Sequence, residues 1–135
     1  MENDKEKFHV ISDLIYNANK SKEINLLTDG LEERQFLHTE DCSECLLILS
    51  ELYDNIPRDK NYHVTSFHWT KILDIAKLVA KYFGIKNVKK SQIKDNVQLG
   101  MKNEPDPYIF KYWKPKISIE EGVNNIIEEI LNNEK

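Results

Sequence analysis

Apolar residues recur at three- and four-residue spacing in four parts of the chain, and each part predicts a helix. The first helix spans His9–Lys20, and the second runs from Thr39 to about Tyr53. The third follows Thr70, and the fourth opens at Ser118. The residues expected on their buried faces are Val10, Ile11, Leu14, Ile15, Ala18, Leu46, Leu49, Tyr53, Ile72, Leu73, Ala76, Val79, Ala80, Phe83, Ile119, Val123, Ile126, Ile127 and Ile130.

Polar residues and glycine mark where these helices begin and end. Thr39 and Thr70 are predicted N-caps, because a threonine hydroxyl accepts a hydrogen bond from a free backbone N–H of the first turn. Ser118–Glu121 has the sequence of a capping box. Gly84 stands where a left-handed residue commonly ends a helix.

Shorter apolar runs predict strands at Ile24–Leu27, Arg34–His38 and Tyr62–Thr65, with a further one near Ile85–Val88. Thr28-Asp29-Gly30 is a turn signal between the first two. Together with the helices, these strands predict a single α/β domain over residues 1–135. Such short and widely separated strands form too small a sheet to be expected in a stable, self-contained domain.

Composition narrows the class of protein. Hydrophobic residues make up 40% of the chain and charged residues 31%, which is typical of a globular protein. The net charge of −4 argues against a nucleic-acid binder. Lys77 and Lys81 interrupt the longest apolar run, so we expect no membrane span. Two cysteines and a charged N-terminus favour a cytoplasmic protein without a signal peptide.

Three stretches together resemble the nucleotide-sugar epimerases and dehydratases of the extended short-chain dehydrogenase/reductase family. Ile24–Asp41 reads INLLTDGLEERQFLHTED and is similar to the family's strand, Asp-Gly turn and Arg-Asp-Phe-Ile-His segment. Tyr62–Ala80 is similar to its Tyr-Asn-Val-Gly-Ser-Gly strand and the helix that follows. Tyr112–Val123, YWKPKISIEEGV, resembles the closing Trp-Lys-Pro-Lys-x-Ser-Leu-Glu-Glu-Gly segment. The opening helix also looks like the family's Val-Ile-Pro-x-Phe-Ile stretch.

The resemblance implies the C-terminal, substrate-binding lobe of such an enzyme, lacking the N-terminal Rossmann half. The family binds NAD(P) through a Gly-x-x-Gly-x-x-Gly turn, and the four glycines here are scattered. No cofactor is therefore expected in this chain. The family's catalysis uses a Tyr-x-x-x-Lys pair. Tyr16 and Lys20 have that spacing but fall downstream of where the pair belongs, so we interpret them as a coincidence and assign no catalytic residue.

Arg34 is the leading candidate for substrate binding. The matching arginine of the family reaches the diphosphate of the sugar nucleotide, and a planar guanidinium can bind phosphate oxygens with two hydrogen bonds. The alternative is a surface arginine paired locally with Asp29, Glu32 or Glu33.

Two further segments are implied in substrate binding. The family's second phosphate-binding arginine falls near Gln92–Val97, a stretch that reads QIKDNV and has Lys94 as its one cation. A lysine would supply a point charge instead of the planar guanidinium. Leu26 and Leu27 occupy the strand that lies beside the nucleotide base in the family. Alternatively, both are ordinary core leucines.

Cys42 and Cys45 form a Cys-x-x-Cys motif near a helix N-terminus. It could be a redox pair, or half of a zinc site completed by a histidine. The neighbouring acidic residues oppose thiolate formation, and the sequence context of either motif is missing. We therefore predict no metal site. The tryptophans, Trp69 and Trp113, are interpreted as packing residues.

The sequence thus predicts the substrate-binding part of an NAD-dependent epimerase or dehydratase, truncated or split and not catalytic alone. The alternative is a non-catalytic binding or interaction module derived from that family. The partners expected are a nucleotide sugar and either a separate cofactor-domain chain or a second copy. The residues expected to contact such a chain are Leu46, Leu49, Val64, Ile72 and Val79.

Overall fold

The structure is a computed structural model that describes residues 9–95 and 102–133. The described residues form a mixed α/β fold with four α-helices, four short strands and one 3₁₀ helix. In chain order these are α1 (Val10–Ser21), β1 (Ile24–Asn25), β2 (Glu33–Gln35), α2 (Thr39–Glu51), β3 (Trp69–Lys71), α3 (Ile72–Phe83), β4 (Val88–Lys89), η3 (Pro107–Lys111) and α4 (Ile119–Asn133). The α/β class predicted from the sequence is confirmed.

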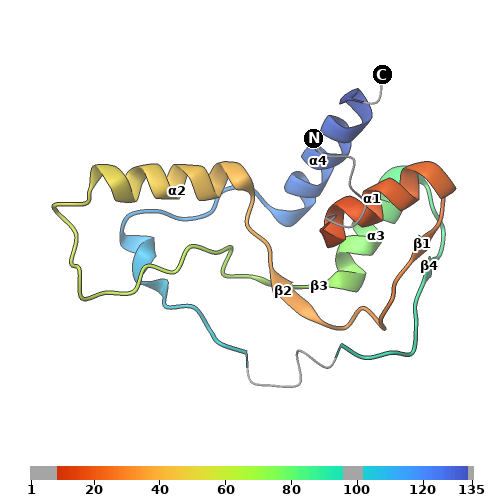
Figure 1. The fold of residues 1–135 in the computed structure, drawn as a ribbon, viewed down its shortest axis with the longest axis horizontal. Helices are drawn as coiled ribbons and strands as arrows, with labels where there is room; N and C mark the ends of the chain where they lie inside the picture. The colour runs from red at the N-terminus through yellow and green to blue at the C-terminus, as the bar shows by residue number, and fades with distance from the viewer. Residues whose placement is uncertain (1–8, 96–101, 134–135) are drawn as a thin grey trace.

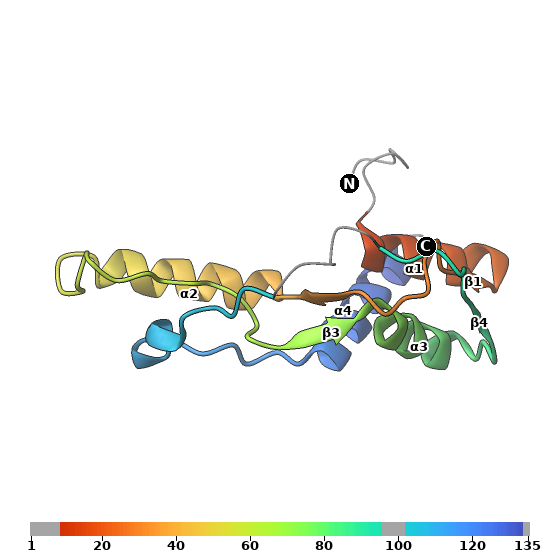
Figure 2. The ribbon, with the colours of Figure 1, turned by 90° about the horizontal axis from the view of Figure 1, so that it is seen from below.

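The chain folds into an elongated body with two parts, as Figures 1 and 2 show. One part, here the helical lobe, contains α1, α3 and α4 with the parallel pair β1–β4. The other, here the arm, contains α2, residues 52–68 and η3. The antiparallel ribbon β2–β3 lies between them. Each sheet within the described residues has two strands.

The core of the helical lobe is built around α3. Ile75, Ala76 and Val79 on this helix are fully buried, and they pack against α1 and α4. Ile15 and Ile127 close the core from those two helices. Burying each large aliphatic side chain contributes roughly 1.5–3 kcal/mol, so this lobe has a core of its own. The apolar periodicity of α1, α3 and α4 is confirmed except at Val10, which is exposed at the start of α1.

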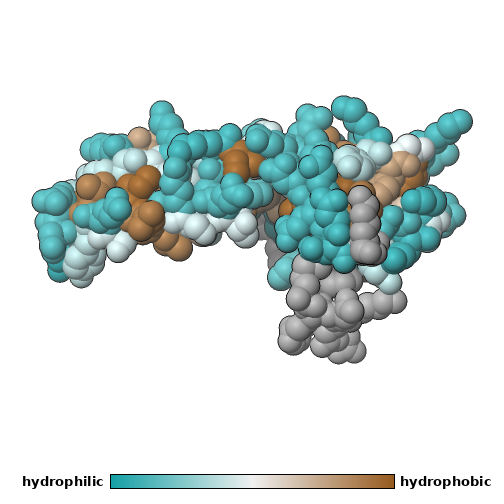
Figure 3. Space-filling view, turned by 90° about the horizontal axis from the view of Figure 1, so that it is seen from above, coloured by the Kyte–Doolittle hydropathy of each residue, from teal (hydrophilic) through white to brown (hydrophobic). Residues whose placement is uncertain are grey.

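The buried face predicted for α2 is wrong at Leu46 and Tyr53, whereas Leu49 is partly buried and packs in the core of the arm. Leu46 and Tyr53 are more than half exposed, as is Leu47. The residues of α2 that are buried are Asp41 and Cys45, and Cys45 packs on η3 and Trp113. Leu46 and Leu47 therefore face solvent, although the helical pattern is apolar at both positions. Figure 3 shows apolar patches on this part of the surface.

The strand predicted at Tyr62–Thr65 is also wrong. The strand that pairs with β2 is β3, and its central pair is Arg34 opposite Thr70. Residues 62–65 instead cross the arm, where the Tyr62 hydroxyl donates to the Pro57 carbonyl at 2.6 Å. Phe67, with φ of 58°, redirects the chain before β3 begins.

Two predicted N-caps differ in the structure. The cap of α2 is His38, whose Nδ1 accepts from the Glu40 backbone N–H at 3.3 Å, and Thr39 is the first helical residue. Thr70 lies inside β3 and is 8% exposed, so Lys71 precedes α3 in its place. Pairing with β2 explains this, because it keeps Thr70 extended.

Other predicted ends are confirmed. Gly84 ends α3 in the left-handed region with φ of 68°. The Ser118 hydroxyl accepts from the Glu121 backbone N–H at 3.2 Å at the start of α4. Gly30 completes the turn before β2 with φ of 73°, and a Cβ there would lie 2.7 Å from Leu26 Cδ1. Only glycine fits this turn without moving its neighbours.

A buried carboxylate joins the arm to the helical lobe. Asp41 is 3% exposed and accepts hydrogen bonds from the backbone N–H groups of Lys116, at 3.0 Å, and Ile117, at 2.9 Å. Both donors belong to the segment that enters α4. On the next turn of α2, Glu44 accepts from the indole N–H of Trp113 at 3.2 Å and pairs with Lys116. No helix of the described residues is long and apolar enough to cross a membrane.

We expect Asp41→Ala to lower the free energy of unfolding by roughly 3 kcal/mol, because two buried backbone N–H groups lose a charged acceptor. Asp41→Asn should cost less, since the amide oxygen still accepts. Urea unfolding followed by Trp113 fluorescence and by circular dichroism measures both. Glu40→Ala is the control, because Glu40 is an exposed carboxylate in the same first turn. Equal losses for Asp41→Ala and Glu40→Ala would contradict the assignment.

Candidate functional site

Arg34 lies on β2, where its side chain is 39% exposed. Its Nη2 donates to Asp95 Oδ2 at 2.7 Å, and its Nη1 donates to the Glu33 backbone carbonyl at 2.9 Å. The acidic partner is thus Asp95, a residue 61 positions away, and not one of the local carboxylates considered from the sequence. Both terminal nitrogens of the guanidinium group are thus hydrogen-bonded, while part of the side chain remains open to solvent.

Backbone hydrogen bonds explain why Asp95 arrives beside β2. The pairing of β1 with β4 continues beyond both strands. Leu26 N donates to the Lys89 carbonyl at 2.9 Å, Ser91 N to that of Thr28 at 3.0 Å, and Asp29 N to that of Ile93 at 2.8 Å. Residues 91–95 therefore run beside residues 26–29 and meet Arg34. The Gln92–Val97 stretch expected near the phosphates begins here, and its last two residues lie outside the described part.

The other predicted substrate residues have different surroundings. Leu26 is 8% exposed and belongs to the core of the helical lobe. This matches the alternative interpretation of a core leucine. Leu27 is 87% exposed, so its side chain is available to a ligand. Lys94 is exposed and has no ion pair within the described residues.

Charges of both signs surround the ribbon β2–β3. Glu33 forms an ion pair with Lys102, and this hydrogen bond lowers the pKa of the Glu33 carboxyl below its ordinary value. Lys102 Nζ also lies 5.2 Å from the Trp69 ring, and the Trp69 indole N–H donates to Glu104 at 3.1 Å. An anion that approaches Arg34 must therefore compete with Asp95 for the fork. The positive charges of Arg34 and Lys102 are thus each paired with a carboxylate, Asp95 and Glu33 respectively.

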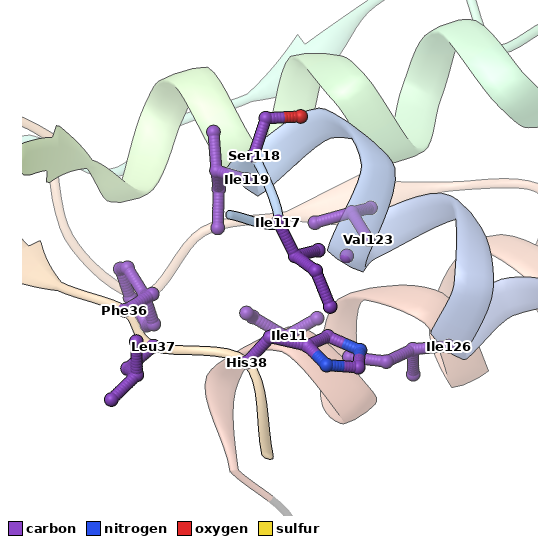
Figure 4. A pocket seen from close by; sticks show the side chains of 10 residues that line it. Ile11, Phe36, Leu37, His38, Ile117, Ser118, Ile119, Val123 and Ile126 are labelled. Atoms are coloured by element: carbon purple, nitrogen blue, oxygen red, sulfur yellow. The ribbon is translucent and has the colours of Figure 1, made fainter. Parts of the chain in front are cut away.

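The sequence analysis missed a small pocket where α1, α4 and the start of α2 meet. Figure 4 shows its mostly apolar lining with the His38 ring at one side. Gly122 leaves room for that ring, since a Cβ on Gly122 would lie 3.2 Å from His38 Cδ2. The pocket volume of about 80 Å³ suits a few water molecules, and ligand sites are usually several times larger. The sequence gives little indication of this pocket. His38 is the one polar ring in its lining, and the sequence did not indicate it as the N-cap of α2, because histidine is uncommon at that position.

The cysteine pair has the character of packing residues. Cys45 is fully buried, and burial raises the pKa of its thiol above the ordinary value, with Cys42 and Glu44 adding to the shift. Cys42 is partly exposed. Within residues 9–95 and 102–133, no group of three or more His, Cys, Asp or Glu side chains is arranged to hold a metal ion.

The described residues do not fit a dinucleotide cofactor. Backbone N–H groups of a glycine-rich turn at a helix N-terminus bind its pyrophosphate in Rossmann folds. Here Gly30 forms a turn packed against Leu26 and Leu73, Gly84 ends a helix, and Gly122 lies inside one. We therefore assign no hydride-transfer step to these residues.

The sequence model of the NAD dependent epimerase/dehydratase family matches residues 2–65 of the chain. No curated protein sequence matches it significantly. The matched residues contain the Asp-Gly turn, Arg34 and the whole of α2.

Solved structures of the same kind share the fold. The UDP-glucose 4-epimerase of Thermotoga maritima with UDP-glucose matches 94% of this chain and 40% of its own, with a TM-score of 0.72 and 15% identity. Bordetella bronchiseptica WbmF with NADH matches with a TM-score of 0.75 and 22% identity, over 93% and 37%. Helicobacter pylori ADP-L-glycero-D-manno-heptose-6-epimerase matches with a TM-score of 0.73 and 19% identity, over 94% and 39%. The chain thus spans about 40% of the length of such enzymes.

We predict that Arg34 and Asp95 are energetically coupled by about 1 kcal/mol, the upper range for a partly exposed pair. A double-mutant cycle with Arg34→Ala and Asp95→Ala, measured by urea unfolding, gives this value. The control cycle uses Lys81 and Glu120, an exposed pair at 3.4 Å elsewhere on the surface, where the coupling should be smaller. Equal coupling energies in the two cycles would show that the Arg34–Asp95 pair does not anchor residues 91–95.

Proposed function

We propose that these residues form the C-terminal, substrate-binding part of an NAD-dependent nucleotide-sugar epimerase or dehydratase. One observation carries the proposal: Arg34, on a fold shared with these enzymes, stands with a half-open guanidinium beside the Lys94–Asp95 segment. The bound UDP-glucose named for the Thermotoga maritima enzyme is the kind of ligand that such a fork would orient. The NAD-binding half and the hydride chemistry lie outside these 135 residues.

Each candidate residue has a distinct part in this proposal. The Arg34 fork binds the diphosphate by two charge-assisted hydrogen bonds when the phosphate displaces Asp95. Lys94 adds a point charge from the adjoining segment. Leu27 presents its exposed side chain to the base, while Leu26 fixes that segment to the core. The bound nucleotide is thereby oriented for a reaction that the cofactor-binding half performs.

The exposed face of α2 supports a partner for the arm. Leu46 and Leu47 lie on it, and Tyr53 is exposed just beyond the end of the helix. Exposed apolar residues of this kind favour association. The prediction that Ile72 and Val79 belong to that interface is wrong, because both are buried in the core of the helical lobe. We propose that a cofactor-binding half covers this face, and that in its absence a second copy does. The same face also favours the second candidate, a non-catalytic interaction module.

Isothermal titration with UDP-glucose tests the binding proposal. We expect Arg34→Ala to weaken binding at least about tenfold, because two charge-assisted hydrogen bonds are lost. Arg34→Lys should recover only part of the affinity, since the fork is lost. Asp95→Asn should strengthen binding, because it removes the competing carboxylate. Arg58→Ala, at an exposed arginine of the arm, is the control and should change nothing.

Unchanged affinity in Arg34→Ala would remove Arg34 from the site. The same titration with NAD⁺ should show no binding to this chain alone. Micromolar affinity for NAD⁺ would overturn the assignment of the cofactor to another half.

Analytical ultracentrifugation tests the interface on α2. We expect the free chain to self-associate through this face, and Leu46→Lys with Leu47→Lys to shift it to monomer without loss of helix content. The matched control, Lys77→Gln with Lys114→Gln, changes exposed residues away from α2 and should leave association unchanged. A monodisperse, stable monomer of the parent chain would instead favour a self-sufficient module.

A further inference from the structure

The charge of this chain is strongly uneven. Its net charge is −4, yet residues 77–90 contain five lysines and no acidic residue. These positions include the C-terminal half of α3, the turn at Gly84 and β4. A local excess of positive charge on an acidic protein concentrates anions at one place on its surface.

The structure turns this segment into a hollow. The chain leaves α3 at Gly84 and runs back beside the helix, and a concave space of about 400 Å³ lies between them. Leu73, Ala80, Ile85 and Val88 give it an apolar floor. The remaining residues that line it are Lys77, Lys81, Lys86, Asn87 and Lys90. The volume lies within the range usual for small-molecule sites.

The lysines around the hollow differ in their pairing. Lys77 lies 3.8 Å from Asp74, and Lys81 lies 3.4 Å from Glu120, and both pairs are exposed. Such pairs contribute little and exchange readily for another anion. Lys86 and Lys90 have no ion pair within the described residues. The lining contains four lysines and no acidic residue, and Asp74 and Glu120 offset only two of the four charges.

The end of α3 does not cancel that field. Carbonyl groups at a helix C-terminus carry a partial negative charge and would repel an anion. Here the Lys81 carbonyl accepts from Gly84 N at 3.3 Å, and the Ala80 carbonyl accepts from Ile85 N at 2.8 Å. These hydrogen bonds satisfy two of the last carbonyls of α3 and so reduce the repulsion.

We propose that this hollow, here the lysine hollow, binds a small organic phosphate. The phosphate lies among Lys81, Lys86 and Lys90, and the apolar floor contacts the organic part. A concave site with an apolar floor favours a small ligand. An extended polyanion would instead bind to a flat row of positive charges. The site is separate from Arg34, which lies on the ribbon β2–β3, and it does not depend on the proposed function.

The test is an NMR titration of the full chain with phenyl phosphate and with inorganic phosphate as probes. We expect saturable amide shifts confined to residues 73–90, with phenyl phosphate binding more tightly because of the apolar floor. Lys86→Gln with Lys90→Gln should weaken binding at least about tenfold. Lys60→Gln with Lys111→Gln, which removes the same charge from the arm, should leave it unchanged.

Three results would overturn the proposal. One is an equal loss of phenyl phosphate affinity in the Lys86/Lys90 double variant and in the Lys60/Lys111 double variant. Another is a shift pattern centred on Arg34 and Asp95, which would leave the proposed function standing. The third is binding of polyglutamate without binding of phenyl phosphate. Conversely, loss of UDP-glucose binding would leave the lysine hollow intact, so the two proposals fail separately.

Discussion

The position of the arm depends on the buried carboxylate of Asp41. Its oxygens bind the backbone of Lys116 and Ile117, and thereby tie the first turn of α2 to the segment that enters α4. The arm has a small core of its own, made by Cys45, Ile109 and Trp113. Since β2 leads directly into α2, this attachment also fixes the direction of β2 and of the Arg34 side chain that it carries.

The Arg34 side chain is held in place by contacts within the chain. Its guanidinium is held by Asp95 and by a backbone carbonyl, so its rotamer is fixed before any ligand arrives. If a phosphate binds Arg34 as proposed, it must replace the Asp95 carboxylate. A fixed cation loses less conformational entropy on binding than a free one, and this offsets part of that competition.

The two parts of the chain differ in how completely their apolar faces are buried. In the helical lobe, α3 is covered by α1 and α4, and its central residues are fully buried. In the arm, Cys45 of α2 is buried, but Leu46 and Leu47 of the same helix are more than half exposed. The contrast lies within one chain, which spans about 40% of the length of the enzymes sharing its fold.

The sequence alone determined the helices, the turn at Gly30 and the ends at Gly84 and Ser118. These features depend on residues within a few positions of one another, because periodicity, caps and left-handed turns are local. It also indicated Arg34 and the segment near Lys94, through a resemblance carried by short motifs.

Only the tertiary structure decided which of those residues could act. It placed Asp95 on Arg34, buried Leu26 while leaving Leu27 exposed, and paired β2 with Trp69–Lys71 and not with Tyr62–Thr65. It also separated the covered face of α3 from the uncovered face of α2, although both have helical periodicity. Each of these outcomes depends on contacts between residues far apart in the chain, which local pattern does not encode.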